Sequence, residues 1–161
     1  MRLRINRAVV LISAAATLAS LCNAQSPGSP PERIDVTLVN PADPSVCTFP
    51  VEIHITGKSK VFNLPGDRMV ITAPGQNATV TNLNNTSKHV TLNTTGVFTF
   101  LNQPDGGVVG IGTGRNLVTD PSFGLTLVIG RFSFAFNSAG ILIQGLTLQG
   151  GQTISVCSLI D

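Results

Sequence analysis

From Ile34 onward the chain alternates apolar and polar residues with a period of two, and turn-forming residues interrupt this pattern every few positions. Successive side chains of a β-strand point to opposite faces, so a period of two is typical of strands with one buried face, and little of this chain has a helical period. The pattern predicts strands at residues 34–39, 51–56, 61–64, 69–72, 78–83, 89–94, 97–101, 108–112, 125–136 and 141–148.

The residues between the predicted strands favour tight turns. Pro-Gly-Asp at 65–67, Ala-Pro-Gly at 73–75 and Asn-Asn at 84–85 supply the fixed or positive backbone angles that turns require. The segment 103–107, Gln-Pro-Asp-Gly-Gly, separates two apolar runs and gives the clearest hairpin signal.

Short strands joined by short turns predict an all-β fold with antiparallel pairing. A single exposed sheet would leave one apolar face in water, so the strands should form either one antiparallel β-barrel or a β-sandwich. We favour the barrel, because the connections are short enough for a meander and a disulfide between the two ends of the domain would fit closure, which makes neighbours of the first and last strands.

The first two dozen residues have the parts of a secretion signal. Arginines near the start form a positive region, residues 8–21 are almost entirely apolar, and residues 22–24 offer a cleavage site. The apolar stretch is shorter than the roughly 20 residues that span a bilayer. We therefore expect residues 1–24 to be a signal peptide and the protein to be secreted, with no integral membrane segment after cleavage. Acylation of Cys22 is a lesser alternative, because Leu21 is bulkier than the residue such sites carry.

The rest of the chain is expected to hold one domain. Residues 25–33 combine Pro, Ser and Gly with no large apolar side chain, which predicts a flexible leader. A chain of this length buries about two thirds of its unfolded surface in one core, so residues 34–161 need no second domain.

Loss of the signal peptide changes the charge balance. It removes three of the ten basic residues, so the mature chain is nearly neutral against its eight acidic residues. A near-neutral chain without a basic stripe disfavours nucleic-acid binding, and the absence of a polybasic or amphipathic helical run disfavours a membrane-surface role.

Two cysteines, Cys47 and Cys157, remain after residue 24. An oxidising compartment lets a disulfide persist, and two cysteines allow only one intramolecular pairing. For a loop of about 110 residues, chain-entropy models predict roughly 4 to 5 kcal/mol of stabilisation. A metal site would lack further ligands, and a reactive thiol is the other alternative. We predict the Cys47–Cys157 disulfide.

The predicted strand 125–136 changes the parity of its apolar residues. They occupy odd positions from 125 to 129, whereas phenylalanines occupy the even positions from 132 to 136. Either the phase slips at Gly130, where glycine suits a bulge or a barrel corner, or both faces of the strand are buried.

Phenylalanines are the best candidates for a binding site. The candidate lining of an apolar cavity is Phe98, Phe100, Phe132, Phe134 and Phe136. Aromatic side chains usually fill cores, so a solid interior is the competing interpretation. A small barrel can hold one modest ligand, and the lack of Trp and Tyr argues against a sugar.

Arg131 follows Gly130 beside this row and is a further candidate ligand-binding residue. Its planar guanidinium could orient an anionic ligand. The alternative is an exposed side chain that pairs with an Asp or a backbone carbonyl at a barrel rim. Arg115 has the same alternatives, and we favour simple exposure for it.

No catalytic residue, metal site or cofactor is predicted. Glu52 and His54 share one strand face and could form an acid and base pair, but an outward polar face above an inward aliphatic one is the favoured interpretation. His89 has no partner in the sequence. The glycines of 106–107 and 110–114 do not form a phosphate loop, because no helix follows them.

Four asparagines match the acceptor pattern for N-linked glycans: Asn77, Asn84, Asn85 and Asn93. They would be modified only in a eukaryotic secretory route, and the sequence leaves a bacterial or eukaryotic host open. We interpret them first as surface strand and turn residues.

Several short motifs resemble those of small exported actinobacterial proteins of unassigned activity. They are Cys47-Thr48-Phe49-Pro50-Val51, Gly57-Lys58, Thr81-Asn82-Leu83, Gly96-Val97-Phe98, Asp105-Gly106-Gly107, Thr113-Gly114-Arg115-Asn116-Leu117, Gly130-Arg131-Phe132 and Cys157. The resemblance covers nearly all of residues 47–161 and implies export and a compact β domain, with no catalytic residue to transfer. A looser architectural likeness to calycin-type, allene-oxide-cyclase-like and dirigent-like barrels implies an interior for apolar ligands or reactive intermediates.

Three functional hypotheses follow. The leading one is a secreted, non-enzymatic β-barrel that binds a small apolar or amphipathic ligand, or an extracellular partner, without a cofactor. The second is a cofactor-free cyclase or isomerase that uses Arg131, or Glu52 with His54, inside the barrel. The third is a structural extracellular or cell-envelope protein. The ligand and the oligomeric state stay open.

Overall fold

The computed structural model describes residues 29–161, and in that part of the chain it contains strands and one short 3-10 helix. The predicted signal peptide lies outside the described residues. The elements are β1 (Glu32–Asn40), β2 (Val51–Leu64), β3 (Arg68–Thr72), β4 (Asn77–Asn82), β5 (His89–Asn93), β6 (Gly96–Asn102), β7 (Val108–Asp120), β8 (Gly124–Phe136), β9 (Leu142–Ser155) and η1 (Cys157–Leu159). The all-β prediction is confirmed.

The predicted strands correspond to the observed ones with two kinds of difference. Residues 51–56 and 61–64 belong to one strand, β2, which continues through Gly57 at a φ of 133° because β1 pairs along it. Strands β7 and β9 extend well beyond their predicted ends, through glycine-rich sequence that reads as turn. Strand β1 begins at Glu32, inside the predicted leader.

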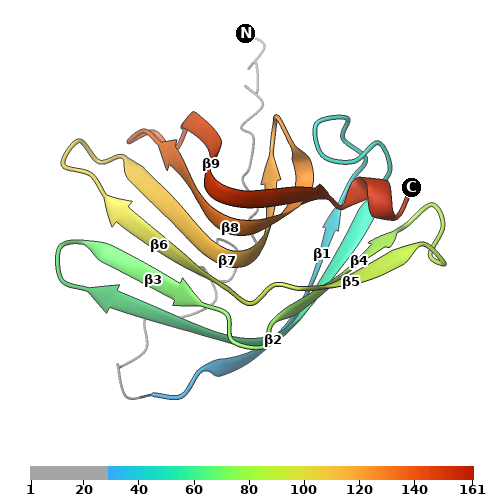
Figure 1. Ribbon diagram of the computed structural model, residues 1–161, viewed down its shortest axis with the longest axis horizontal. Helices are drawn as coiled ribbons and strands as arrows, with labels where there is room; N and C mark the ends of the chain where they lie inside the picture. The colour runs from blue at the N-terminus through green and yellow to red at the C-terminus, as the bar shows by residue number, and fades with distance from the viewer. Residues whose placement is uncertain (1–28) are drawn as a thin grey trace, which may run out of the picture.

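All strand pairs are antiparallel, and the long strand β2 organises them into two arms. The first half of β2 pairs with β1 on one side and with β4 on the other, and β5 follows β4; these strands form the first arm. The second half of β2 pairs with β3, and the second arm continues through β6, β7 and β8 to β9. Figure 1 shows the two arms as parts of one strongly curved sheet.

Hydrogen bonding between strands does not close this sheet. Within residues 29–161, no ladder joins β9 to β1 or β5, so the predicted barrel closure is not confirmed. The predicted disulfide is confirmed: Cys47, between β1 and β2, is bonded to Cys157 after β9, with their Cα atoms 5.6 Å apart. The buried Asn82 side chain also donates a hydrogen bond to the Ile160 carbonyl, 3.0 Å away. The C-terminal segment is thereby fastened to the first arm (Figure 1).

A row of glycines crosses four neighbouring strands of the second arm. Strand pairing aligns Gly96, Gly114, Gly130 and Gly151. Gly130 has a φ of 130°, and a Cβ atom there would lie 2.2 Å from the Gly150 carbonyl oxygen. Only glycine fits this backbone, and glycine kinks are a common way to curve a sheet. The prediction that Gly130 suits a corner is consistent with this geometry.

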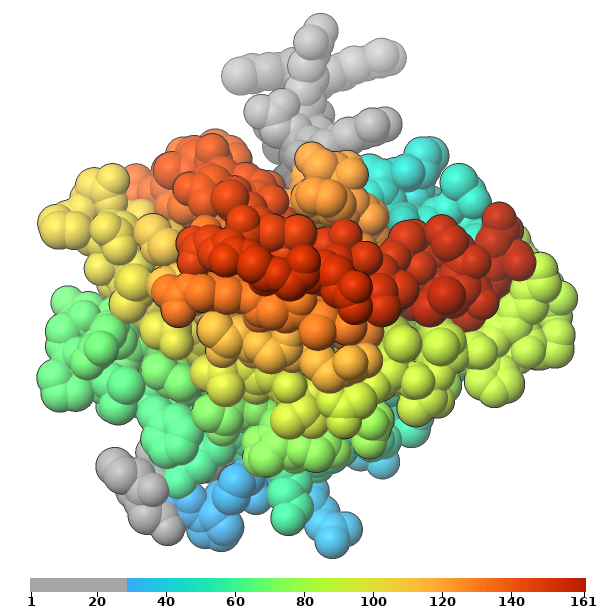
Figure 2. Space-filling model, viewed as in Figure 1, coloured from blue at the N-terminus to red at the C-terminus, as the bar shows by residue number. Residues whose placement is uncertain are grey.

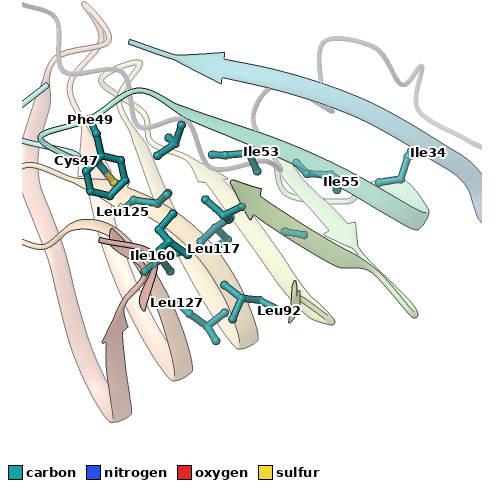
Figure 3. Packing of buried hydrophobic residues seen from close by; sticks show 14 residues of the cluster. Ile34, Cys47, Phe49, Ile53, Ile55, Leu92, Leu117, Leu125, Leu127 and Ile160 are labelled. Carbon is teal, nitrogen blue, oxygen red and sulfur yellow. The ribbon is translucent and has the colours of Figure 1, made fainter. Parts of the chain in front are cut away.

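Between the glycine row and the β7–β8 turn, the hairpin of β7 and β8 is buried on both faces. Leu117 and Leu127 join one core cluster with residues of the first arm such as Ile53 (Figure 3). Val118 and Val128 point the other way and join a second cluster. The β7–β8 register is continuous along its length, so the side chains of β8 do not slip in phase against β7. Both faces are buried before Gly130, whereas Arg131 after it is exposed. Against β9 the register does shift next to Gly130, as expected for a bulge there.

Candidate functional site

The five candidate phenylalanines form one connected cluster in the second core. Phe98 and Phe100 come from β6, and the other three come from β8. The ring centres of Phe98 and Phe132 are 5.8 Å apart, and those of Phe100 and Phe134 are 6.2 Å apart. These are ordinary spacings for edge-to-face aromatic pairs. The two predicted rows therefore meet, and they do so along one face of the sheet.

Two glycines of β7 make this contact possible, although β7 lies between β6 and β8. A Cβ atom on Gly112 would lie 2.1 Å from Cζ of Phe132, and one on Gly110 would lie 2.2 Å from Cζ of Phe134. The rings thus lean across the bare β7 backbone toward β6. Sequence reasoning missed this role, although alternating glycines beside alternating phenylalanines are its signal.

Burial divides the aromatic cluster into an inner and an outer end. The inner rings of Phe132, Phe134 and Phe98 are 0%, 4% and 5% exposed. The outer end is half-buried. It comprises Phe100 and Phe136 together with two aliphatic neighbours that pack against the same core, Met69 and Leu142. It lies toward the β2–β3 and β6–β7 turns, at the left of Figure 1. The inner rings pack as core, and the outer end retains apolar surface in contact with solvent.

The strand register places uncharged amides beside the outer end. Asn63 pairs with Met69, and Asn102 pairs with Val108, which in turn pairs with Phe136. Both asparagines are exposed. Directly paired residues share a sheet face, so the outer end carries hydrogen-bonding groups without charge.

Arg131 does not join the aromatic cluster. It alternates with Phe132 along β8 and is exposed, and its Nε donates a hydrogen bond to Oε1 of Gln149 at 2.7 Å. Arg115 also bonds locally, because its Nε donates to the Asn93 carbonyl at 3.1 Å. Arg131 is therefore exposed as the plainer alternative has it, although its partner is the Gln149 amide and neither an Asp nor a backbone carbonyl, and Arg115 is half-buried.

Glu52 and His54 lie on the outer face of the first arm, opposite the buried Ile53. His54 Nε2 lies 2.7 Å from an Asp35 carboxylate oxygen, and both side chains are substantially exposed. The favoured interpretation of an outward polar face is confirmed. Sequence reasoning missed Asp35, because a cross-strand neighbour requires the β1–β2 register. Arg131 is likewise exposed, so none of the three side chains named for the cyclase or isomerase hypothesis lies in a core cluster.

The four acceptor-pattern asparagines all fall on the β4–β5 hairpin. Asn77 and Asn93 pair across the two strands, and Asn84 and Asn85 lie in the connecting turn. Three are exposed and Asn77 is half-buried, as expected for surface strand and turn residues.

Residues 29–161 contain no group of three or more His, Cys, Asp or Glu side chains placed to hold a metal ion. In the same part of the chain, no helix has the length and apolar composition needed to cross a membrane.

Comparison of the chain with protein-family models, with curated proteins and with solved structures found no match. The resemblance to small exported β-domain proteins therefore stays a prediction.

Proposed function

We propose that this protein is an exported, non-enzymatic β domain that binds a small apolar or amphipathic molecule at the outer end of its aromatic cluster. The observation that supports this most is the change in burial along the cluster. Phe132 is fully buried, whereas Phe100 and Phe136 keep part of their rings in contact with solvent. The inner rings hold the outer ones in place, so a ligand would meet a preformed apolar surface.

The proposed ligand is uncharged and modest in size. Asn63 and Asn102 offer neutral donors and acceptors beside the outer end, which suits a hydroxyl, amide or ester group better than an ion. Burial of apolar surface contributes about 25 cal/mol per Å², so about 300 Å² would supply some 7.5 kcal/mol before the costs of association. We therefore expect a dissociation constant on the order of micromolar or weaker.

We further propose that the curved sheet is a barrel without a closing ladder, with a sandwich as the alternative description. The disulfide and the Asn82 bond to the Ile160 carbonyl tie the last segment to the first arm. They would serve in place of a closing ladder. The same disulfide supports export, because such bonds persist mainly in oxidising compartments.

Titration with an environment-sensitive apolar dye tests the binding proposal. We expect saturable binding to the wild type and at least tenfold weaker binding for Phe100→Ala and Phe136→Ala. The matched control is Phe123→Ala, because Phe123 lies in the β7–β8 turn and is 42% exposed. The control should bind as the wild type does. Absence of saturable binding, or an equal loss in Phe123→Ala, would overturn the proposal.

A further inference from the structure

The four acceptor-pattern asparagines differ from the other asparagines of the described chain in both position and sequence context. All four lie on the β4–β5 hairpin, and none of them is buried. Six further asparagines occur in residues 29–161 without Ser or Thr two positions later: Asn40, Asn63, Asn82, Asn102, Asn116 and Asn137. Two of these six, Asn82 and Asn116, are buried. Because Ser and Thr occur throughout the chain, the acceptor pattern is confined to accessible positions of one hairpin more selectively than composition requires.

The hairpin brings the parts of an acceptor site together at the surface. Residues two positions apart in a strand share a face, so Asn77 and Thr79 both lie on the outer face of β4. Asn93 and Thr95 are both exposed, and the Asn93 side-chain oxygen accepts a hydrogen bond from the Thr95 N–H at 3.1 Å. This bond uses the oxygen of the amide, whereas a glycan is attached to its nitrogen.

The same geometry limits the hairpin to two glycans. Asn77 and Asn93 are direct cross-strand partners, whose Cβ atoms are typically about 4.5–5.5 Å apart. Asn84 and Asn85 are neighbours in the turn. An N-linked glycan is bulky, so each pair has room for one. In the first pair Asn93 is exposed and Asn77 is half-buried, which favours Asn93.

We infer that the β4–β5 hairpin carries two N-linked oligosaccharides when the chain passes through a eukaryotic secretory route, one at Asn93 and one at Asn84 or Asn85. The donor is a lipid-diphosphate oligosaccharide. The side-chain nitrogen forms a bond to C1 of the first sugar and loses a proton, while the bond from C1 to the diphosphate oxygen breaks and the lipid diphosphate leaves. This modification depends on the export that forms part of the proposed function.

Glycans at these positions would cover one edge of the sheet and leave the aromatic cluster open. Strand β5 is an edge strand, and a bulky polar group beside an edge hinders pairing with another chain. Figure 2 shows the hairpin, in yellow-green, at the right of the molecule, whereas the outer end of the aromatic cluster lies toward the left (Figure 1). The modification would therefore be compatible with ligand binding.

Secretion of the full chain from a eukaryotic cell line tests the two-glycan hairpin. The intact mass before and after treatment with a peptide N-glycosidase gives the number of glycans per chain. That enzyme converts each modified asparagine to aspartate, so peptide mapping locates them. We expect two glycans, one at Asn93 and one at Asn84 or Asn85. Thr95→Val, which removes the hydroxyl that the pattern requires, should abolish the glycan at Asn93. The matched control is Thr37→Val, at an exposed threonine outside any acceptor pattern, and it should keep both glycans.

A predominant secreted species with no glycan, with one, or with more than two overturns the inference. So does a chain that carries glycans on Asn77 and Asn93 together, or a glycan at Asn93 that persists in Thr95→Val. A second form of the protein with a foreign signal sequence separates this result from export. If the chain leaves the cell only with the foreign signal, export of the native chain is contradicted, and the glycan count of the secreted form still decides whether the hairpin is modified.

Discussion

At the scale of single residues, Gly112 is a packing residue whose missing side chain makes room for the Phe132 ring. Its φ is not in the left-handed region, so the constraint at this position is space and not backbone conformation. Gly112→Ala should lower the free energy of unfolding by about 1–3 kcal/mol, as overpacking of a core typically does. Denaturant unfolding measures this change.

A double-mutant cycle separates crowding from backbone strain. Combined with Phe132→Leu, Gly112→Ala should cost less than the sum of the single changes, because leucine does not reach across β7. Gly140→Ala is the control, since Gly140 has a φ of 73° with open space around its Cβ position. Its cost, about 1–2 kcal/mol of backbone strain, should simply add to that of Phe132→Leu. Additive effects at Gly112 would contradict the packing role.

At the scale of elements, β8 is distinctive because its first half is buried on both faces. Leu127 and Val128 are neighbours, point in opposite directions, and are both fully buried. Leu127→Ala should cost about 2–5 kcal/mol, and Val128→Ala about 2 kcal/mol, because each leaves a cavity in a different core. Denaturant unfolding is the measurement. Val128→Ala within about 0.5 kcal/mol of the wild type, as at an exposed site, would contradict this arrangement.

The elements also show how far the sequence determines the fold. Alternation located the strands, since Val51, Ile53 and Ile55 all face the core as their parity predicts. It placed the aromatic candidates on β6 and β8, and it assigned Glu52 and His54 to an outer face. These results depend only on which side of a strand a residue occupies.

Pairing between distant strands lies beyond such local patterns. The contact of Phe98 with Phe132 requires that β7 lie between their strands with Gly112 in register. In the sequence, the apolar residues of β8 change from odd to even positions, which resembles a phase slip. The structure shows instead that the hairpin lies between two cores. Arg131 likewise stands beside the phenylalanines in the sequence but on the other face of the strand. The sequence pattern therefore does not contain the register of the distant strands or the curvature of the sheet.

At the scale of the whole molecule, the two cores share the β7–β8 hairpin, and the disulfide fixes the far end of the chain to the first arm. Replacing Cys47 and Cys157 together by serine should lower the free energy of unfolding by roughly 4–5 kcal/mol, because the unfolded chain then regains the freedom of a long loop. Denaturant unfolding of the variant and of the wild type measures the difference. A loss below about 1 kcal/mol would show that noncovalent contacts alone hold the C-terminal segment against the first arm.

The position of the disulfide further predicts where the serine variant opens first. The C-terminal segment is held by the Val156 N–H bond to the Leu125 carbonyl, by the Asn82 side chain and by the burial of Val156 and Ile160, whereas β2 lies between paired strands. A segment without a strand ladder opens locally more easily than a central strand, so amide hydrogen exchange at residues 156–160 should accelerate more than exchange within β2. The wild type under the same conditions is the control. Uniform acceleration across both regions would instead mean that the disulfide stabilises the sheet as one unit and does not act as a local clasp.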